Sequence, residues 1–354
     1  MPVSQIQAAD IADLLNSTRA QEEPLKVTDI ASDIQDWIVL PQVLNRQHVK
    51  FGTGTSFDFT LNTSWDSNFK WAGLFEADNL TQIDGTVKGS VPYRHVQSGW
   101  LMDVRQERMN MAPNRIWDFK QMKRHQMLGG WAQGWEDSFW TIPASGDVVN
   151  PFGLFYYLVY NATEGFNGGN HANFSGGPAG VSRTDYTDWK HYAGQYTYVS
   201  QSDLMDMIDR AMTYCQWKPI PQAAVSGHGS GRPRWGLYTL YDPVIQGMKE
   251  IIRGNNDSLG SFDLDPLGQV TIRRIPVQYV PQLQEYESTA DPFFGLDWDQ
   301  FGFVFLEDRY MVESPVRVRA DHHNEVEQFL DCSGNWVMTN SRTSFAFAKS
   351  DWTA

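Results

Sequence analysis

Cysteine is scarce in this sequence. The 354 residues include two, Cys215 and Cys332. Two thiols cannot form the disulfide framework of a small secreted domain, so we expect free thiols or at most one bridge. Neither cysteine has a CxxC partner or a flanking basic residue that would favour the thiolate, and neither is predicted to be a nucleophile.

Positive charge and long apolar runs are also in short supply. Lys and Arg number 28 against 42 Asp and Glu, which gives a net charge of -14. Tight, sequence-independent binding of nucleic acid needs many cations against the phosphates, so that class of protein is a poor fit. The longest apolar run, Phe152–Tyr160, is too short to span a bilayer. The first ten residues lack the basic and apolar regions of a signal peptide, so we expect no export and no membrane partner.

Common catalytic and nucleotide-binding motifs are absent. The sequence has no GxxxxGK[ST] loop, no GxGxxG turn between a strand and a helix, no HExxH and no GxSxG. Gly227–Gly231 is rich in glycine but lacks the lysine of a phosphate loop, so we predict a flexible loop there. We therefore predict a protein that is not an enzyme, with no catalytic residue, no cofactor-binding residue and no metal ligand.

One histidine-bearing segment is the best candidate for a metal site by residue type. Asp321–Glu327 places His322 and His323 among carboxylates. Adjacent side chains point to different faces in a helix or a strand, and no further ligands are indicated. The favoured interpretation is a solvated turn.

A second cluster combines carboxylates with aromatic rings. The segment Asp291–Asp299 contains Asp291, Asp297 and Asp299 beside Phe293, Phe294 and Trp298. Glycosidases hold sugars between carboxylates and aromatic side chains, so a carbohydrate-active enzyme is an alternative function. We favour an acidic loop that aromatic residues anchor to the core.

Aromatic residues are abundant, with 14 Trp, 14 Tyr and 20 Phe, and 29 Gly and 17 Pro accompany them. Large rings and many turn residues are typical of a β-rich protein with broad contact surfaces. In the segment 51–108, apolar residues alternate with polar ones at 57–61 and again at 96–104, which predicts two strands. The polar stretch 77–92 between them predicts the loose tip of a long two-stranded excursion. Because such a hairpin is marginal alone, we expect another molecule to cover it.

The clearest predicted helix spans 114–139, where four large side chains form one stripe: Leu128, Trp131, Trp135 and Phe139. Gly129, Gly130 and Gly134 lower its helix propensity by about 1 kcal/mol each, unless they admit a neighbouring backbone. Residues 91–130 are net basic, with seven Lys or Arg against three acids. This band is either a solvated face or a seam against acidic surface, such as the segment 285–299, on another subunit.

The remaining pattern alternates helices and strands. Ser202 is predicted to cap a helix to about Trp217, and Asp242 a second helix that ends at Gly254. A strand at 235–240 and another at 270–275 flank the second helix, which is typical of an α/β unit. Further strands are expected at 301–306, 311–312, 316–318, 336–339 and 344–348. Residues 1–50 are expected to hold short helices, one of which ends at Pro41.

This order of elements, with the closing segments 301–312 and 336–349, resembles the major capsid protein of tailed bacteriophages. The resemblance covers essentially the whole chain and implies an α+β, Hong Kong 97-like fold. It implies an N-terminal arm at 1–50, an E-loop β-excursion at 51–110, a spine helix with the first part of the peripheral domain at 111–200, an axial domain at 201–310, and the C-terminal strands of the peripheral domain at 311–354. The sequence shows no long, charged, helical prefix, so a separate scaffold protein, or none, is expected.

The resemblance also implies a function. The chain would be the structural subunit of an icosahedral capsid, assembling with itself into hexamers and pentamers around double-stranded DNA that it does not bind specifically. Scaffold, portal and decoration proteins would be further partners. The protein would be made in the host cytoplasm and reside in the virion shell. The alternatives are an encapsulin-like nanocompartment shell, a phage tail or baseplate protein, and the carbohydrate-active enzyme.

Overall fold

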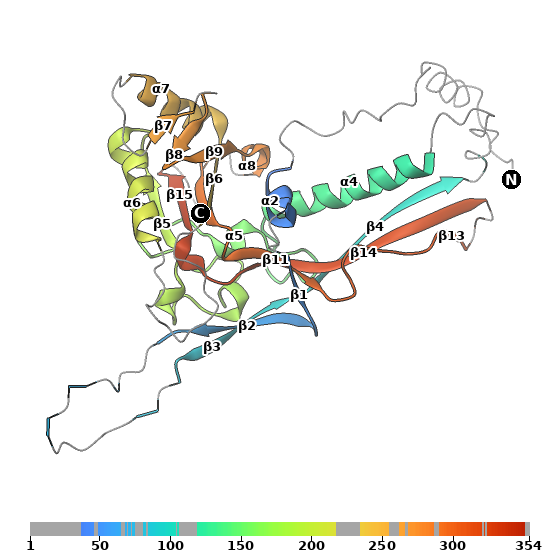
Figure 1. The fold of residues 1–354 in the computed structure, drawn as a ribbon, viewed down its shortest axis with the longest axis horizontal. Coiled ribbons are helices and arrows are strands. Elements are labelled where there is room, and N and C mark those ends of the chain that lie inside the picture. Colours follow the sequence, from blue (N-terminus) through green and yellow to red (C-terminus); the bar gives the residue numbers. More distant parts are fainter. Residues whose placement is uncertain are drawn as a thin grey trace. The chain divides into compact units, whose positions relative to one another are not determined.

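The computed structural model describes residues 37–45, 49–64, 68, 70, 71, 73, 74, 81, 82, 84–103, 105, 119–216, 234–254, 262–265, 268–286, 290–320, 322 and 324–350. Figure 1 labels their helices and strands. These residues fall into two compact units. The described part of the smaller unit comes from Val96–Gly134 and Met311–Cys332. That of the larger unit comes from Gln35–His95, Trp135–Tyr310 and Ser333–Ala354. The expected helices before residue 37, the loop Gly227–Gly231 and the predicted helix start at 114–118 lie outside the described residues.

A seven-stranded sheet forms the core of the larger unit. Its order is β5-β15-β10-β6-β9-β8-β7. The strands are β5 (Tyr192–Tyr196), β6 (Trp235–Thr239), β7 (Phe262–Leu264), β8 (Val270–Ile272), β9 (Ile275–Tyr279), β10 (Phe293–Asp297) and β15 (Phe345–Lys349). β5 runs parallel to β15, and β6 runs parallel to β9 across a helical connection. The α/β unit is therefore present, but β9 closes it instead of the strand predicted at 270–275.

Two helices cover this sheet: α6 (Asp206–Tyr214) and α7 (Gly247–Gly254). Their buried side chains join the sheet in one hydrophobic cluster, in which Ile208 and Met248 meet Leu237 and Phe293. The predicted inward stripe of the first helix is confirmed, because its four members are all buried: Leu204, Ile208, Ala211 and Cys215. Apolar periodicity of 3.6 residues thus located both helices correctly.

The predicted starts of these helices were wrong. Each begins with a π-helical turn, η3 (Gln201–Met205) before α6 and η4 (Tyr241–Gln246) before α7. The residues at the N-cap position are Ser200 and Leu240, and neither caps with its side chain. In the first case the Asp203 carboxylate instead accepts hydrogen bonds from the backbone N–H groups of Thr197 and Tyr198, at 2.8 and 2.9 Å. That contact fixes the incoming chain without a serine cap.

The predicted strand at 270–275 is two strands joined by a tight turn. Arg273 and Arg274 occupy this turn with φ angles of 49° and 69°, a left-handed conformation that side chains generally avoid. Contacts with α6 offset the cost of this backbone conformation. The Nη2 atom of Arg273 lies 2.9 Å from Asp209 Oδ1 and 2.6 Å from Thr213 Oγ1. The turn is therefore anchored to the helix that covers the sheet.

The excursion pairs differently from the prediction. β2 (Ser56–Asn62) is confirmed, with its phenylalanines more buried than the polar residues between them. Its partner, however, is β3 (Thr86–Pro92), which lies in the stretch predicted to be the tip. The glycine of β3 explains the miss: Phe59 lies over Gly89, and a Cβ there would be 2.8 Å from the ring. The second predicted strand is β4 (Arg94–Asp103), which pairs with β14 (Glu325–Met338) instead.

β14 is the longest strand and contributes to both units. In the larger unit it pairs with β11 (Phe301–Leu306), which runs parallel to β1 (Val49–Gly52). In the smaller unit it pairs with β12 (Val312–Glu313) and β13 (Arg317–Val318). The sequence predicted only its last part, because charged and polar residues interrupt the apolar pattern before Leu330.

Helix α4 (Phe119–Phe139) confirms the described part of the predicted long helix. Trp131, Trp135 and Phe139 are buried, whereas Leu128 is half-buried. In the larger unit, Trp135 meets Phe303 edge to face at 4.4 Å between ring centroids, and Phe139 meets Trp336 at 5.1 Å. Such ring pairs stabilise a core beyond the area they bury.

Helix α2 (Val39–Asn45) contradicts the prediction that a helix ends at Pro41. The proline instead lies in the first turn, where the missing N–H breaks no helical hydrogen bond. The N–H groups of Ile38, Val39 and Leu40 point at the carboxylate of Glu136.

The chain between the short helix α5 (Leu154–Tyr157) and β5 has little regular structure, and a buried arginine organises it. The Arg183 guanidinium donates to the carbonyl oxygens of Tyr157, Gly169 and Trp189 at 2.6 to 3.2 Å. Burial lowers the pKa of Arg183 to about 9, so it remains charged at neutral pH. One cation thus holds three segments together.

Candidate assembly surfaces

Two of the three carboxylates of 291–299, Asp291 and Asp297, are buried with the aromatic rings, whereas Asp299 is exposed. Asp297 and Trp298 are 2% and 1% exposed. Asp297 Oδ1 accepts the N–H groups of Arg234 and Asp299 at 3.0 and 3.1 Å, and burial raises the pKa of this carboxyl. Asp291 binds Lys349 Nζ at 3.2 Å. The favoured interpretation, an acidic segment anchored by aromatic residues, therefore describes the structure, and a sugar-binding cleft at this segment does not.

The other candidate sites offer no ligand set in the described residues. His322 is half exposed beside Glu325, with Nδ1 and Oε1 3.6 Å apart, and Glu325 already begins β14. No group of three potential metal ligands occurs in the part of the chain that the structure describes. Both cysteines are free and buried, and burial raises the pKa of the Cys215 thiol. None of the described helices is long and apolar enough to cross a membrane.

Two cations of the predicted basic band have partners within the smaller unit. Arg105 Nη2 lies 2.8 Å from Asp103 Oδ2, and Arg124 grips Glu313 with Nε and Nη2. In the segment 285–299, Glu285 and Asp299 are the described acids that remain exposed. Asp291 and Asp297 are buried, so these two acids of the segment cannot take part in the predicted seam with the basic band.

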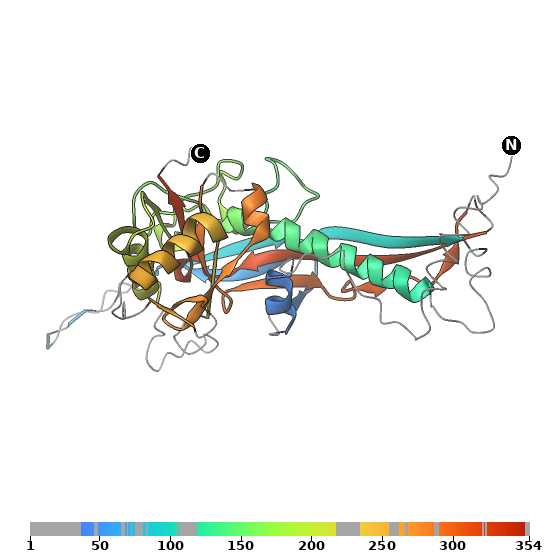
Figure 2. The ribbon, with the colours of Figure 1, turned by 90° about the horizontal axis from the view of Figure 1, so that it is seen from above.

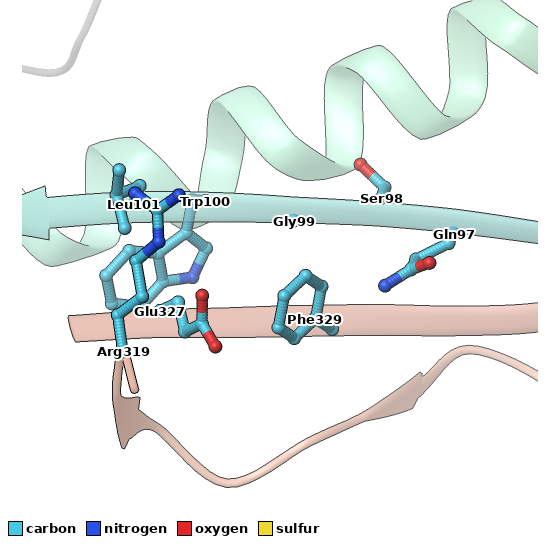
Figure 3. A pocket seen from close by; sticks show the side chains of 8 residues that line it. All are labelled: Gln97, Ser98, Gly99, Trp100, Leu101, Arg319, Glu327 and Phe329. Carbon is cyan, nitrogen blue, oxygen red and sulfur yellow. The ribbon is translucent and has the colours of Figure 1, made fainter. Parts of the chain in front are cut away.

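A shallow groove of about 530 Å³ lies on the smaller unit, on the β4–β14 face (Figure 3). Its apolar part is formed by Leu101, which is 46% exposed, and Phe329. Figure 3 shows Ser98 pointing the other way, toward α4, where its Oγ donates to the Met127 carbonyl at 3.3 Å.

Charged side chains surround this apolar strip and pair across β13 and β14. Arg317 Nε lies 2.9 Å from Glu327 Oε1, and Arg319 Nη1 lies 3.0 Å from Glu325 Oε2. Arg317 also lies over the Phe329 ring, 4.9 Å from its centroid. An apolar strip with a rim of paired charges suits contact with another polypeptide rather than chemistry on a small molecule.

Large apolar side chains are exposed in several places on the larger unit. Trp71 and Leu74, in the segment between β2 and β3, are 90% and 94% exposed. The two-stranded ribbon of β2 and β3 has an apolar face, on which Phe59 packs near Trp189. Its other face is polar and carries the Lys88–Asp58 ion pair. Further exposed apolar residues are Phe51, Val148, Val149, Tyr198, Tyr214 and Tyr241. Of these residues, the highly exposed Trp71 and Leu74 are the strongest candidates for a contact with another molecule.

Comparison with solved structures identifies proteins of the same fold, all at low sequence identity. No family model and no curated protein matches this sequence. The capsid protein of cyanophage A-1(L) matches with a TM-score of 0.55 at 13% identity, over 95% of this chain and 99% of that one. The capsid protein of a native GTA particle matches with a TM-score of 0.52 at 12% identity, over 94% and 98%. The SrpI encapsulin of Synechococcus elongatus matches with a TM-score of 0.53 at 11% identity, over 96% of each chain.

These matches extend across nearly the whole of both chains, so the likeness concerns the complete subunit fold rather than one shared motif. The fold that the order of elements suggested from the sequence is thus confirmed. The chain has the α+β, Hong Kong 97-type fold of phage major capsid proteins.

Proposed function

We propose that this chain is the structural subunit of an icosahedral phage capsid. The observation that carries the proposal is the match over 95% of this chain and 99% of the cyanophage capsid protein. The exposed Trp71 and Leu74, with the apolar strip of Leu101 and Phe329, support a protein whose surfaces are completed by neighbours.

In this proposal the chain assembles with itself into hexamers and pentamers that enclose double-stranded DNA. The net charge of -14 supports a wall that repels the phosphates and does not trap the packaged DNA. The chain is made in the host cytoplasm and ends in the virion shell. Scaffold, portal and decoration proteins are the further partners of such a subunit, and catalysis has no part in it.

The parts of the fold take matching roles. We assign residues 1–50 to the N-terminal arm and 51–110 to the E-loop, whose paired part is the β2–β3 ribbon. Helix α4 is the spine helix within 111–200, and 311–354 supplies the closing strands of the peripheral domain. The axial domain comprises 201–310, with β5 and β15 completing its sheet.

Negative-stain electron microscopy of the purified protein tests the proposal. Closed polyhedral particles, or separate hexamers and pentamers, are the expected result. A chain that stays monomeric at all concentrations and salt conditions would overturn it.

An encapsulin-like compartment is the second candidate, since the SrpI encapsulin matches with a TM-score of 0.53, within the range of the phage capsids. Both candidates form shells, so microscopy alone does not separate them. The neighbouring genes do: portal and terminase genes support the phage capsid, whereas a cargo-enzyme gene supports the compartment.

A further inference from the structure

The loop between α4 and α5 carries two adjacent valines at its surface. Val148 and Val149 are 74% and 68% exposed. In Figure 2 this loop is the green segment that follows the mint-green helix α4. Single exposed apolar residues are ordinary, but a pair presented by one short loop needs a reason.

Hydrogen bonds hold this loop in one conformation. Asp147 Oδ1 accepts the N–H groups of Val149 and Asn150 at 2.7 and 3.2 Å, and Asp147 Oδ2 accepts the Asn150 amide at 2.5 Å. A second turn precedes it, in which the Asp147 N–H donates to the Ala144 carbonyl at 3.1 Å and Gly146 has a φ of 76°. The valines therefore lie on a preorganised turn rather than on a loose segment.

A largely buried arginine supports the same turn from below. Arg94 is 8% exposed, and its guanidinium donates to the carbonyl oxygens of Asp147 and Val148 while lying over the ring of Phe152, 5.3 Å from the centroid. Burying a cation is costly unless it is bonded, and here the two terminal nitrogens of the guanidinium bind the backbone of a surface loop. Rigid presentation reduces the entropy that a side chain loses on binding.

The loop also carries little charge. From Thr141 to Thr163 the sequence has a single charged residue, Asp147, and the contacts above engage its carboxylate. Removal of charge is the compositional mark of the centre of an interface, whereas the rest of this chain is strongly acidic. Two copies with a net charge of -14 repel each other, and a surface with little charge reduces that repulsion where they touch.

We propose that Val148 and Val149 form an apolar knob that inserts into an uncharged surface of a second copy of this chain. The inference rests on the proposed function and adds a contact to it. The kind of partner follows from the chemistry: an apolar knob without cations suits neither nucleic acid nor an anionic membrane, and the charge argument applies to like copies.

An isosteric double variant tests the knob. Val148→Thr with Val149→Thr keeps the shape of both side chains and adds hydroxyls that would be buried in the contact. We expect the protein concentration needed for half-maximal assembly to rise at least tenfold. The matched control, Val148→Ile with Val149→Ile, keeps the apolar surface and should assemble within about threefold of wild type. Since both valines are exposed, the thermal midpoint of the unassembled subunit should not change in either variant.

Cross-linking identifies the partner. Benzoylphenylalanine at position 148 in assembled particles should give a covalent dimer of this chain after illumination. If the wild-type chain forms shells and the threonine variant assembles equally well, the proposed contact is wrong. It is also wrong if cross-links in assembled shells form with another protein alone. If the wild-type chain forms no shell or capsomer, the proposed function fails first and this inference fails with it.

Discussion

The carboxylate of Glu136 accepts a hydrogen bond from the backbone N–H of Val39, with 2.9 Å between Oε1 and the nitrogen, although 97 positions separate them. Glu136 also accepts the N–H groups of Ile38 and Leu40 and the indole of Trp140. A buried side chain of α4 thus satisfies the free N–H groups at the start of α2, a task that a neighbouring serine or aspartate usually performs.

Replacing Glu136 by glutamine should release the start of α2. One oxygen would become an amide N–H2 facing N–H donors, and buried donors left without an acceptor cost about 1–3 kcal/mol. We expect the free energy of unfolding to fall by roughly that amount, as measured by urea denaturation. The exposed Glu285 provides the control, and Glu285→Gln should leave the midpoint unchanged. Equal midpoints for both variants would show that α2 does not depend on this carboxylate.

His191 should make the subunit acid-sensitive. The ring is fully buried with Nε2 3.0 Å from the Val159 nitrogen, and burial and the nearby Arg183 hold the pKa of His191 well below its ordinary 6.5. As the pH falls below about 6.5, His191 therefore gains a proton in the unfolded chain but stays neutral in the folded chain. Stability is present above that pH and declines as pH falls toward the folded pKa, by up to about 1.4 kcal/mol per pH unit.

The variant His191→Asn should flatten this decline between pH 6.5 and 5, in denaturation curves measured at each pH. The exposed His125 is the matched control, and His125→Asn should keep the wild-type slope. An unchanged slope in His191→Asn would assign the acid sensitivity to other groups.

Alanine at two glycines of α4 should stabilise the isolated subunit. Within the described residues, nothing lies within 4 Å of the position that a Cβ would take at Gly130 or Gly134. Each substitution should therefore raise the free energy of unfolding by about 1 kcal/mol through helix propensity alone. Ala132→Gly, on the same helix, should lower it by a similar amount. A loss of stability in Gly130→Ala would reveal a packing constraint, whereas a stable subunit with impaired assembly would place a neighbouring subunit against the helix.

Gly295 on β10 fixes the position of Phe345 on the paired strand β15. The ring of Phe345 lies where a Cβ at position 295 would be, and the two residues face each other in the antiparallel register. Gly295→Ala should cost about 1–3 kcal/mol in urea denaturation because the ring must shift in a closely packed core. Adding Phe345→Leu should recover part of that loss, whereas strictly additive losses would mean that the two residues do not compete for space.

Periodicity made much of this fold predictable from the sequence. Alternation located β2 and β4, and the 3.6-residue stripes located α4, α6 and α7. The misses occurred where a distant partner overrides local preference. Lys88-Gly89-Ser90 has the composition of a turn but forms strand because Phe59 packs over the glycine. Pro41 suggested a helix end but lies in a first turn that Glu136 caps from far along the chain.

The candidate surfaces were harder to predict than the core. The carboxylates at 291 and 297 have the composition of a sugar site, and only their burial shows that they hold backbone and Lys349 instead. The valine pair at 148 and 149 gave no periodic pattern, although the scarcity of charge from Thr141 to Thr163 was visible in the sequence. Exposure depends on how the chain is folded, and a short loop has too few residues for a pattern to reveal it.

The place of β15 in its sheet has a consequence for how the subunit is made. Residues 345–349 lie between β5 and β10, so the sheet is interrupted until they are added. During synthesis, β5 leaves the ribosome about 150 residues before the strand that joins it, and at typical elongation rates that delay lasts several seconds or more. The sheet can therefore be completed only after residue 349 has emerged, so β5 and β10 lack their shared neighbour for most of the synthesis of the chain.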